Sequence, residues 1–67
     1  MNKLLIEVYM DGYITGIIAG QERTVELYVP GEELTIENPV NDNPLSYVGF
    51  VQGYREAIFF KKGVQRT

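Results

Sequence analysis

The chain has 67 residues, nine of them acidic and six basic, with a net charge of −3 at pH 7 and neither cysteine nor histidine. These absences exclude disulfide bonds and remove thiolate and imidazole, the side chains most often used as nucleophiles, general bases and metal ligands. A chain this short buries only about 60% of the surface of its unfolded state, so association with another chain is the remaining way to strengthen a small core.

The composition predicts one globular domain over residues 1–67, because 45% hydrophobic and 22% charged residues are ordinary for a folded protein. No run approaches the roughly 18 apolar residues of a membrane span, and the apolar stretch at residues 4–6 is too short for a signal peptide. We therefore expect a cytoplasmic protein without membrane contact. A domain this small has little room for both a core and a water-excluding pocket, so we expect no enzymatic activity, no cofactor and no metal site.

The beginning of the chain carries an alternation of apolar and polar side chains that is typical of β-strands. Within residues 1–10 the apolar positions of one face are Leu4, Ile6, Val8 and Met10. The following Asp11-Gly12 pair is a strong hairpin signal, because both turn positions need positive φ. Residues 13–19 then predict the returning strand, in which Gly16 indicates a bulge or a close approach of another backbone.

Two further strands are expected before the middle of the chain. Residues 23–29 alternate cleanly and end at Pro30-Gly31, a pair that favours a turn. Residues 32–37 form a short acidic strand of the kind that protects a sheet edge. The predicted fold is therefore α+β: a small antiparallel meander of three to four strands over residues 1–37, packed by one C-terminal helix.

The C-terminal helix is expected over residues 43–63, after a loop at residues 38–42. Asn43 suits the N-cap and Pro44 suits the first helical position, where its missing N–H has no cost. Two lysines then lie where the helix dipole favours cations, and Gly63 suits the C-cap. These signals mark both ends of the helix.

The interior of this helix is less regular than its ends, since its two glycines cost about 1 kcal/mol each relative to alanine. An alternative interpretation ends the helix near Tyr54 and continues as a strand through residues 57–60. In either case we expect residues 64–67 to be a frayed tail.

The predicted helix is apolar around most of its circumference, and its side chains divide into two stripes. The stripe expected to pack on the sheet contains Tyr47, Val51, Tyr54 and Ile58. The second stripe, expected to bind a partner, contains Ser46, Gly49, Phe50, Gly53, Ala57 and Phe60. Its two glycines leave the backbone bare on consecutive turns, so we expect the same helix of a second copy to approach closely there. Alternatively, the glycines let the helix lie flat on its own sheet.

The sequence therefore predicts a small non-enzymatic interaction, regulatory or accessory protein that forms a homodimer, a kind of protein that phages and other mobile elements carry. An acidic surface that could face an unidentified protein target is formed by Glu26, Glu32, Glu33 and Glu37. The alternative function is nucleic-acid association through a basic end, made of Arg55, Lys61, Lys62 and Arg66. A few cations at one end are far from the broad basic patch of a nucleic-acid-binding domain, so nucleic acid is the less favoured partner.

Overall fold

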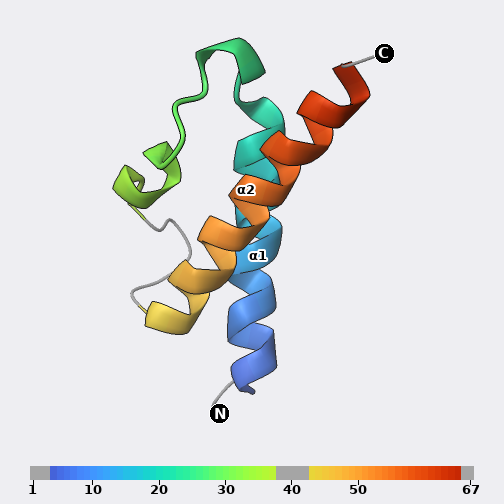
Figure 1. Ribbon diagram of the computed structural model, residues 1–67. Helices are drawn as coiled ribbons and strands as arrows, with labels where there is room; N and C mark the ends of the chain where they lie inside the picture. Colours follow the sequence, from blue (N-terminus) through green and yellow to red (C-terminus); the bar gives the residue numbers. More distant parts are fainter. Residues whose placement is uncertain (1–3, 38–42, 66–67) are drawn as a thin grey trace.

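The computed structural model describes residues 4–37 and 43–65, and none of these residues lies in a β-strand. Two long helices and two short 3-10 helices make up the fold (Figure 1). In chain order the elements are α1 (Leu5–Glu22), η1 (Val25–Leu27), η2 (Glu32–Thr35) and α2 (Pro44–Gln65).

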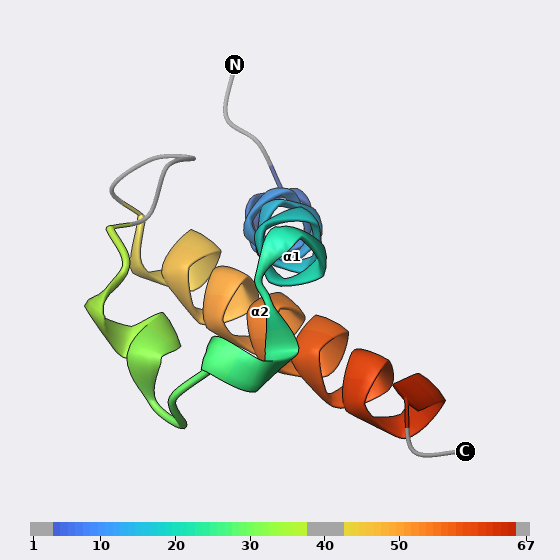
Figure 2. The ribbon, with the colours of Figure 1, turned by 90° about the horizontal axis from the view of Figure 1, so that it is seen from above.

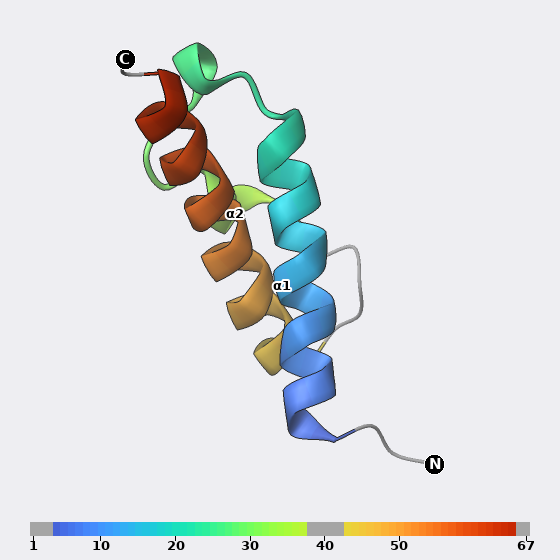
Figure 3. The same cartoon turned by 90° about the vertical axis from the view of Figure 1, so that its right-hand side faces the viewer.

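The two long helices lie side by side and run in the same direction (Figures 1 and 3). Their contacts give the register: Gly12, in the middle of α1, lies against Ser46 near the start of α2, and Gly20, near the end of α1, lies against Ala57. A parallel pair cannot be joined by a tight turn, so the chain between the helices has to return along their length. This connecting segment packs on α2 through both η1 and η2 (Figure 2).

Five glycines allow the backbones of α1 and α2 to touch. A Cβ placed on Gly16 would lie 2.1 Å from the carbonyl oxygen of Phe50, and one on Gly53 would lie 2.1 Å from the carbonyl oxygen of Tyr13. Real Cβ atoms essentially never come closer than 3.0 Å to such neighbours, so no larger residue fits at these positions. We call this contact the glycine seam, and its members are Gly12, Gly16, Gly20, Gly49 and Gly53.

The apolar core lies mainly on the other side of α2. Phe50, Tyr54 and Ile58 form a buried cluster, against which Tyr28 and Ile36 of the connecting segment pack. α2 is thus covered on one side by α1 and on another by the connecting segment, which makes it the central element of the fold.

Local contacts fix both ends of α1. At its start, the backbone N–H of Leu4 donates to the Glu7 carboxylate at 3.1 Å. At its end, Lys61 of α2 donates to the carbonyl oxygens of Gln21 and Arg23, at 2.7 and 2.6 Å. Because the last carbonyls of a helix lack partners within it, this lysine both caps α1 and ties it to α2.

The molecule is elongated, with extents of 47 × 21 × 14 Å and a radius of gyration of 12.5 Å, against about 11 Å for a compact domain of this length. Its accessible surface is 4871 Å², whereas a compact monomer of this mass exposes about 4300 Å². Neither α1 nor α2, as far as they are described, combines the length and the apolar character needed to cross a membrane.

The predicted α+β fold is wrong, because residues 5–22 form one helix where a β-hairpin was expected. The apolar alternation over residues 4–10 is also compatible with a helix, since Ile6 and Met10 are four residues apart and share one helical face. The Asp-Gly pair predicted to form the hairpin turn lies in the middle of α1, where Gly12 contacts α2.

The strands predicted at residues 23–29 and 32–37 are wrong as well, since these segments contain η1 and η2. In the second segment Leu34 was expected to point inward and Glu33 outward, but Glu33 is exposed by only 1% and Leu34 by 55%, whereas Ile36 packs against the core as expected. A buried carboxylate needs a cationic partner. Glu33 has one in Arg55, a contact that no local sequence pattern reveals.

The prediction of a C-terminal helix is close to the observed α2, which spans Pro44–Gln65. Asn43 caps it as expected, because its side-chain oxygen accepts a hydrogen bond from the N–H of Leu45 at 2.8 Å. Residues 57–60 are helical, so the alternative strand there is wrong.

Gly63, predicted to be the C-cap, lies inside α2, since the helix continues to Gln65. Some predicted features fall outside the described residues: the loop at 38–42, the start of the first strand at 1–3 and the last two residues of the tail at 66–67.

The glycine seam predicts that Gly16→Ala destabilises the protein. The added Cβ would lie 2.1 Å from the carbonyl oxygen of Phe50, so the helices would have to separate. Overpacking of this kind costs about 1–3 kcal/mol or more, which outweighs the roughly 1 kcal/mol that alanine gains over glycine in a helix. We expect a net loss of about 2 kcal/mol in the free energy of unfolding, measured by urea denaturation followed by circular dichroism.

Gly63→Ala is the matched control, because a Cβ at this helical position meets nothing within 4 Å. It should leave stability unchanged or raise it by up to about 1 kcal/mol. Equal stability of the two variants would contradict the close backbone contact.

Candidate interaction surface

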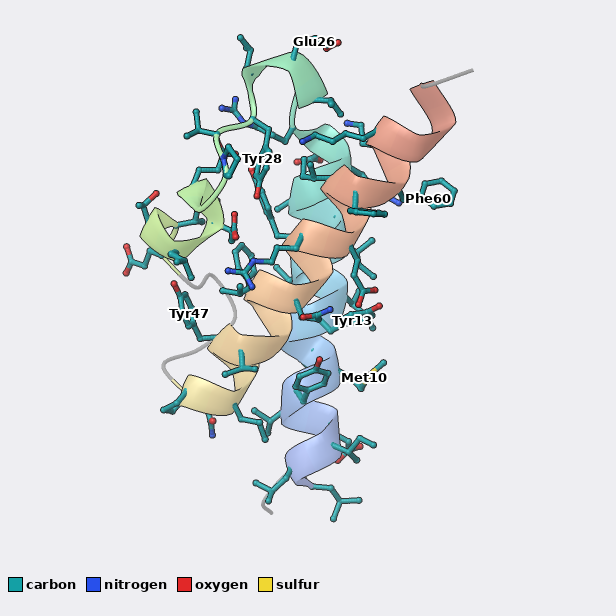
Figure 4. The ribbon with its side chains drawn as sticks, in the orientation of Figure 1. Met10, Tyr13, Glu26, Tyr28, Tyr47 and Phe60 are labelled. Atoms are coloured by element: carbon teal, nitrogen blue, oxygen red, sulfur yellow. The ribbon has the colours of Figure 1, made fainter. Side chains whose placement is uncertain are left out.

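α1 turns a row of large aliphatic side chains away from the rest of the molecule. The row, which we call the outer stripe, consists of Ile6, Met10, Ile14 and Ile18, with exposures of 67%, 40%, 51% and 51%. A spacing of four residues places them on successive turns of one helix face. Figure 4 shows Met10 on the side of the molecule away from the connecting segment, the side to which Tyr13 and Phe60 also point.

A shallow groove between the two helices adjoins the outer stripe near the end of α1. It has a volume of about 290 Å³ and is lined by Ile17, Gln21, Glu56, Ala57 and Phe60. Phe60 is 71% exposed, so an aromatic ring of α2 stands beside the aliphatic row of α1. The apolar surface therefore extends over both helices.

One polar cluster interrupts this apolar face. The hydroxyl group of Tyr13 on α1 donates to the carboxylate of Glu56 on α2, and the side-chain amide of Gln52 donates to the same carboxylate at 2.6 Å. The hydrogen bonds from Gln52 and Tyr13 lower the pKa of Glu56 below its usual value. The cluster thus links the two helices through a carboxylate that stays ionised.

On the opposite side of the molecule, Glu32 fastens the connecting segment to α2. Its carboxylate accepts two hydrogen bonds from the guanidinium of Arg23, at 2.8 and 3.0 Å, and one from the hydroxyl group of Tyr54. These hydrogen bonds, that from Arg23 first, lower the pKa of Glu32 to about 2. Burial and the same contact with Glu32 raise the pKa of Tyr54 to about 12.

The neighbouring Glu33 makes a second attachment and is the most buried charged group described. Arg55 of α2 pairs with its carboxylate at 2.5 Å, and the hydroxyl group of Tyr28 donates to it at 2.8 Å. Burial alone would raise the pKa of Glu33, but the hydrogen bonds from Arg55 and Tyr28 outweigh this effect and lower it. Both acidic residues therefore hold the connecting segment in place as carboxylates.

The stripe of α2 that was expected to bind a partner lies mostly against α1 of the same chain. Ser46 and Phe50 are 0% and 1% exposed, Ala57 is 6% exposed, and Gly49 and Gly53 belong to the glycine seam. Of the six residues of this stripe, Phe60 alone is exposed and part of the groove. A helix does pack closely against Gly49 and Gly53, but it is α1 of the same chain and not the helix of a second copy.

The expected acidic surface is divided between two environments. Glu32 and Glu33 turn toward α2 and are engaged by arginine and tyrosine side chains, as described above. Glu26, on η1, and Glu37 remain exposed. The four carboxylates therefore do not form one continuous surface.

The expected basic end is also largely engaged within the molecule. Arg55 pairs with Glu33, and Lys61 caps α1. Lys62 lies over the ring of Tyr28, 5.3 Å from its centroid. Arg66 lies outside the described residues.

The outer stripe was not predicted as a surface. Ile6 and Met10 were expected on the apolar face of a strand, and neither Ile14 nor Ile18 was singled out. The signal was nevertheless present, because these residues recur every fourth position, in step with Gly12, Gly16 and Gly20. When glycines and large aliphatic residues each recur every four residues in the same segment, the pattern indicates one helix with glycines on one face and apolar side chains on another.

Comparison with protein-family models, with characterised proteins and with solved structures gives no significant match to this chain. A function for this chain therefore has to be inferred from the geometry and chemistry of its surfaces.

The attachment through Glu32 predicts that the protein loses stability in acid. Its pKa is about 2 in the folded state against an ordinary 4.5, so folding favours the ionised form. This stabilisation is fully present above about pH 4.5 and is lost progressively as the pH falls toward 2. We expect the midpoint of urea unfolding to fall over this range, and Glu32→Gln to lower the midpoint at pH 7 while flattening its pH dependence.

Glu26→Gln serves as the control, because Glu26 is an exposed acid on the same connecting segment. It should retain the acid sensitivity of the unchanged protein. An acid transition that is the same in Glu32→Gln and in Glu26→Gln would contradict the role given to Glu32.

Proposed function

We propose that this protein is a small, non-enzymatic interaction protein that binds another protein chain through the outer stripe of α1. One observation carries the proposal. Four large aliphatic side chains on successive turns of α1 are exposed by 40% to 67%, although the opposite face of the same helix is closed against α2. Contiguous apolar patches of this kind, rimmed by polar residues, mark sites of protein interaction.

The size of the patch supports this interpretation. If each half-exposed side chain of this size contributes roughly 100 Å², the outer stripe and Phe60 together expose about 500 Å². The largest apolar patch on a typical monomer is about 300–600 Å² and is often functional. An ordered row of this size differs from the single exposed hydrophobic residues that occur on every protein surface.

The polar side chains support a binding role over a catalytic one. Glu32, Glu33 and Glu56 each accept hydrogen bonds that join different elements of the fold. In the described ranges, 4–37 and 43–65, no group of three acidic, cysteine or histidine side chains is placed to hold a metal ion. The groove beside Phe60 is shallow and open to solvent, unlike the enclosed pockets in which catalytic groups are desolvated.

The alternative, nucleic-acid association, is less well supported. Arg55, Lys61 and Lys62 would have to leave Glu33, the end of α1 and Tyr28 before they could neutralise phosphates. Binding would then compete with the contacts that hold the fold together. The cytoplasmic location expected from the sequence stays a prediction.

The proposal predicts that a photo-reactive group on the outer stripe crosslinks to a partner, whereas the same group elsewhere on the surface does not. A photo-reactive benzophenone amino acid at position 14, replacing Ile14, should yield a covalent adduct with another protein chain when cells expressing the protein are irradiated. Ile14 is 51% exposed, so the replacement leaves the packing of α1 on α2 intact. The adduct is detected as a band of higher mass on a denaturing gel.

The matched control carries the same amino acid at Glu26, an exposed position on η1. We expect no adduct from this position. Absence of an adduct at position 14, or equal adducts at both positions, would contradict binding through the outer stripe.

A further inference from the structure

We propose that the chain bound by the outer stripe is a second copy of this protein, packed antiparallel to the first. In this arrangement, the start of α1 in each copy meets the end of α2 in its partner. The inference rests on the function proposed above, and it names the partner and its orientation.

The two helices are offset along the long axis of the molecule. In Figures 1 and 3, the first turn of α1 extends past the start of α2, and the last turns of α2 extend past the end of α1. The register agrees, because Gly20 near the end of α1 lies against Ala57, whereas α2 continues to Gln65. Each copy therefore has one projecting helix end at each end of its long axis.

Both projecting ends are also apolar. At the start of α1, Leu4, Leu5 and Ile6 are 68%, 72% and 67% exposed. Near the end of α2, Phe59 and Phe60 are 79% and 71% exposed, the two most exposed large aromatic side chains described. Both groups therefore remain largely exposed to solvent in the single chain.

A two-fold axis perpendicular to the long axis lets the second copy cover both projecting apolar ends at the same time. It places the projecting start of α1 from one copy beside the projecting end of α2 from the other, and the same contact recurs at the opposite end. It also brings the two outer stripes face to face between these contacts. A parallel pair would instead place like ends together and leave each projection without a complementary shape.

Charge favours the same orientation. Over its whole length α1 carries acidic residues and no basic residue, and two of its acids, Glu7 and Asp11, lie in its first half. The end of α2 carries Lys61 and Lys62, which keep their positive charge in their contacts with carbonyl oxygens and with the Tyr28 ring, and no acid follows Glu56. Antiparallel packing sets the acidic half of α1 beside the basic end of α2, whereas parallel packing superposes like charges.

The available area is sufficient for a stable dimer. The exposed side chains of the two projecting ends and of the outer stripe, at roughly 100 Å² each, together offer about 800 Å². A standard stable interface buries about 800 Å² on each partner. The excess of the observed surface over that of a compact monomer, described above, is of the same order.

Cysteine pairing tests both the partner and its orientation, because the chain has no cysteine of its own. Ile6→Cys and Phe60→Cys are prepared separately, one of them with an affinity tag, then mixed and oxidised. A disulfide needs its two Cα atoms within about 7 Å. We expect the mixed disulfide between positions 6 and 60 to form at least about tenfold more than either symmetric disulfide.

Glu26→Cys is the negative control and should remain unpaired with either variant. Sedimentation equilibrium of the unchanged protein should give twice the chain mass of 7.6 kDa. Ile14→Gln, at an exposed helical position, should shift the mass toward that of one chain while far-UV circular dichroism stays the same.

Symmetric disulfides at positions 6 and 60 without the mixed product would overturn the antiparallel orientation. A mass of 7.6 kDa without any disulfide would overturn the identity of the partner. In that second case, a photo-adduct with a different protein at position 14 would leave the proposed function standing, so the two failures are distinguishable.

Discussion

The backbone contact at the glycine seam is the constraint on which the rest of this structure depends. Gly12, Gly16 and Gly20 occupy the face of α1 that meets α2, and a side chain at any of them would collide with α2. Apart from Val8, the buried residues of α1 are therefore glycines. Four of its large aliphatic residues lie on the outer face instead, so the seam that joins the helices also accounts for the exposed outer stripe.

The parallel direction of the two helices imposes the second feature, a long connecting segment that returns along α2. In the part that the structure describes, residues 23–37 and 43, this segment contains the short helices η1 and η2, and its side chains attach it to α2. Glu32 and Glu33 reach cations at two different places, Arg23 within the segment and Arg55 on α2. Removing paired charges from water gives little net stability, but an unpaired buried charge is costly. These pairs therefore specify where the segment lies more than they stabilise it.

The parts of the fold that could be predicted from the sequence are those set by local chemistry. Asn43 is favourable at an N-cap and Pro44 at the first helical position, and α2 begins there. In residues 5–22, local chemistry favours a β-hairpin, whereas the structure has a helix. Three glycines weaken a helix by about 1 kcal/mol each, and an Asp-Gly pair favours a turn. These residues are helical because α2 contacts the glycines, and that contact lies between segments more than 30 residues apart.

The same distinction applies to the candidate surface. The two bare turns at Gly49 and Gly53 indicate that some helix can approach α2 closely, but not which one. α1 of the same chain packs against these two glycines. The exposed apolar side chains therefore lie mainly on α1, and not on α2 as predicted. Only the matching four-residue spacing of the glycines at 12, 16 and 20 links the two helices in the sequence. Spacing alone shows a bare face and does not identify its neighbour.

The outer stripe also bears on how α1 is stabilised. The buried residues of α1 are Val8 and three glycines, so this helix removes little apolar side-chain surface from water within its own chain. Burial contributes about 25 cal/mol per Å², so covering the stripe, roughly 400 Å² for its four side chains, would contribute on the order of 10 kcal/mol before the entropic cost of association. That gross contribution is comparable to the whole stability of a small domain, about 5–15 kcal/mol. A partner that covers the stripe would therefore stabilise the fold as well as bind to it, and folding and association of this chain would be thermodynamically linked.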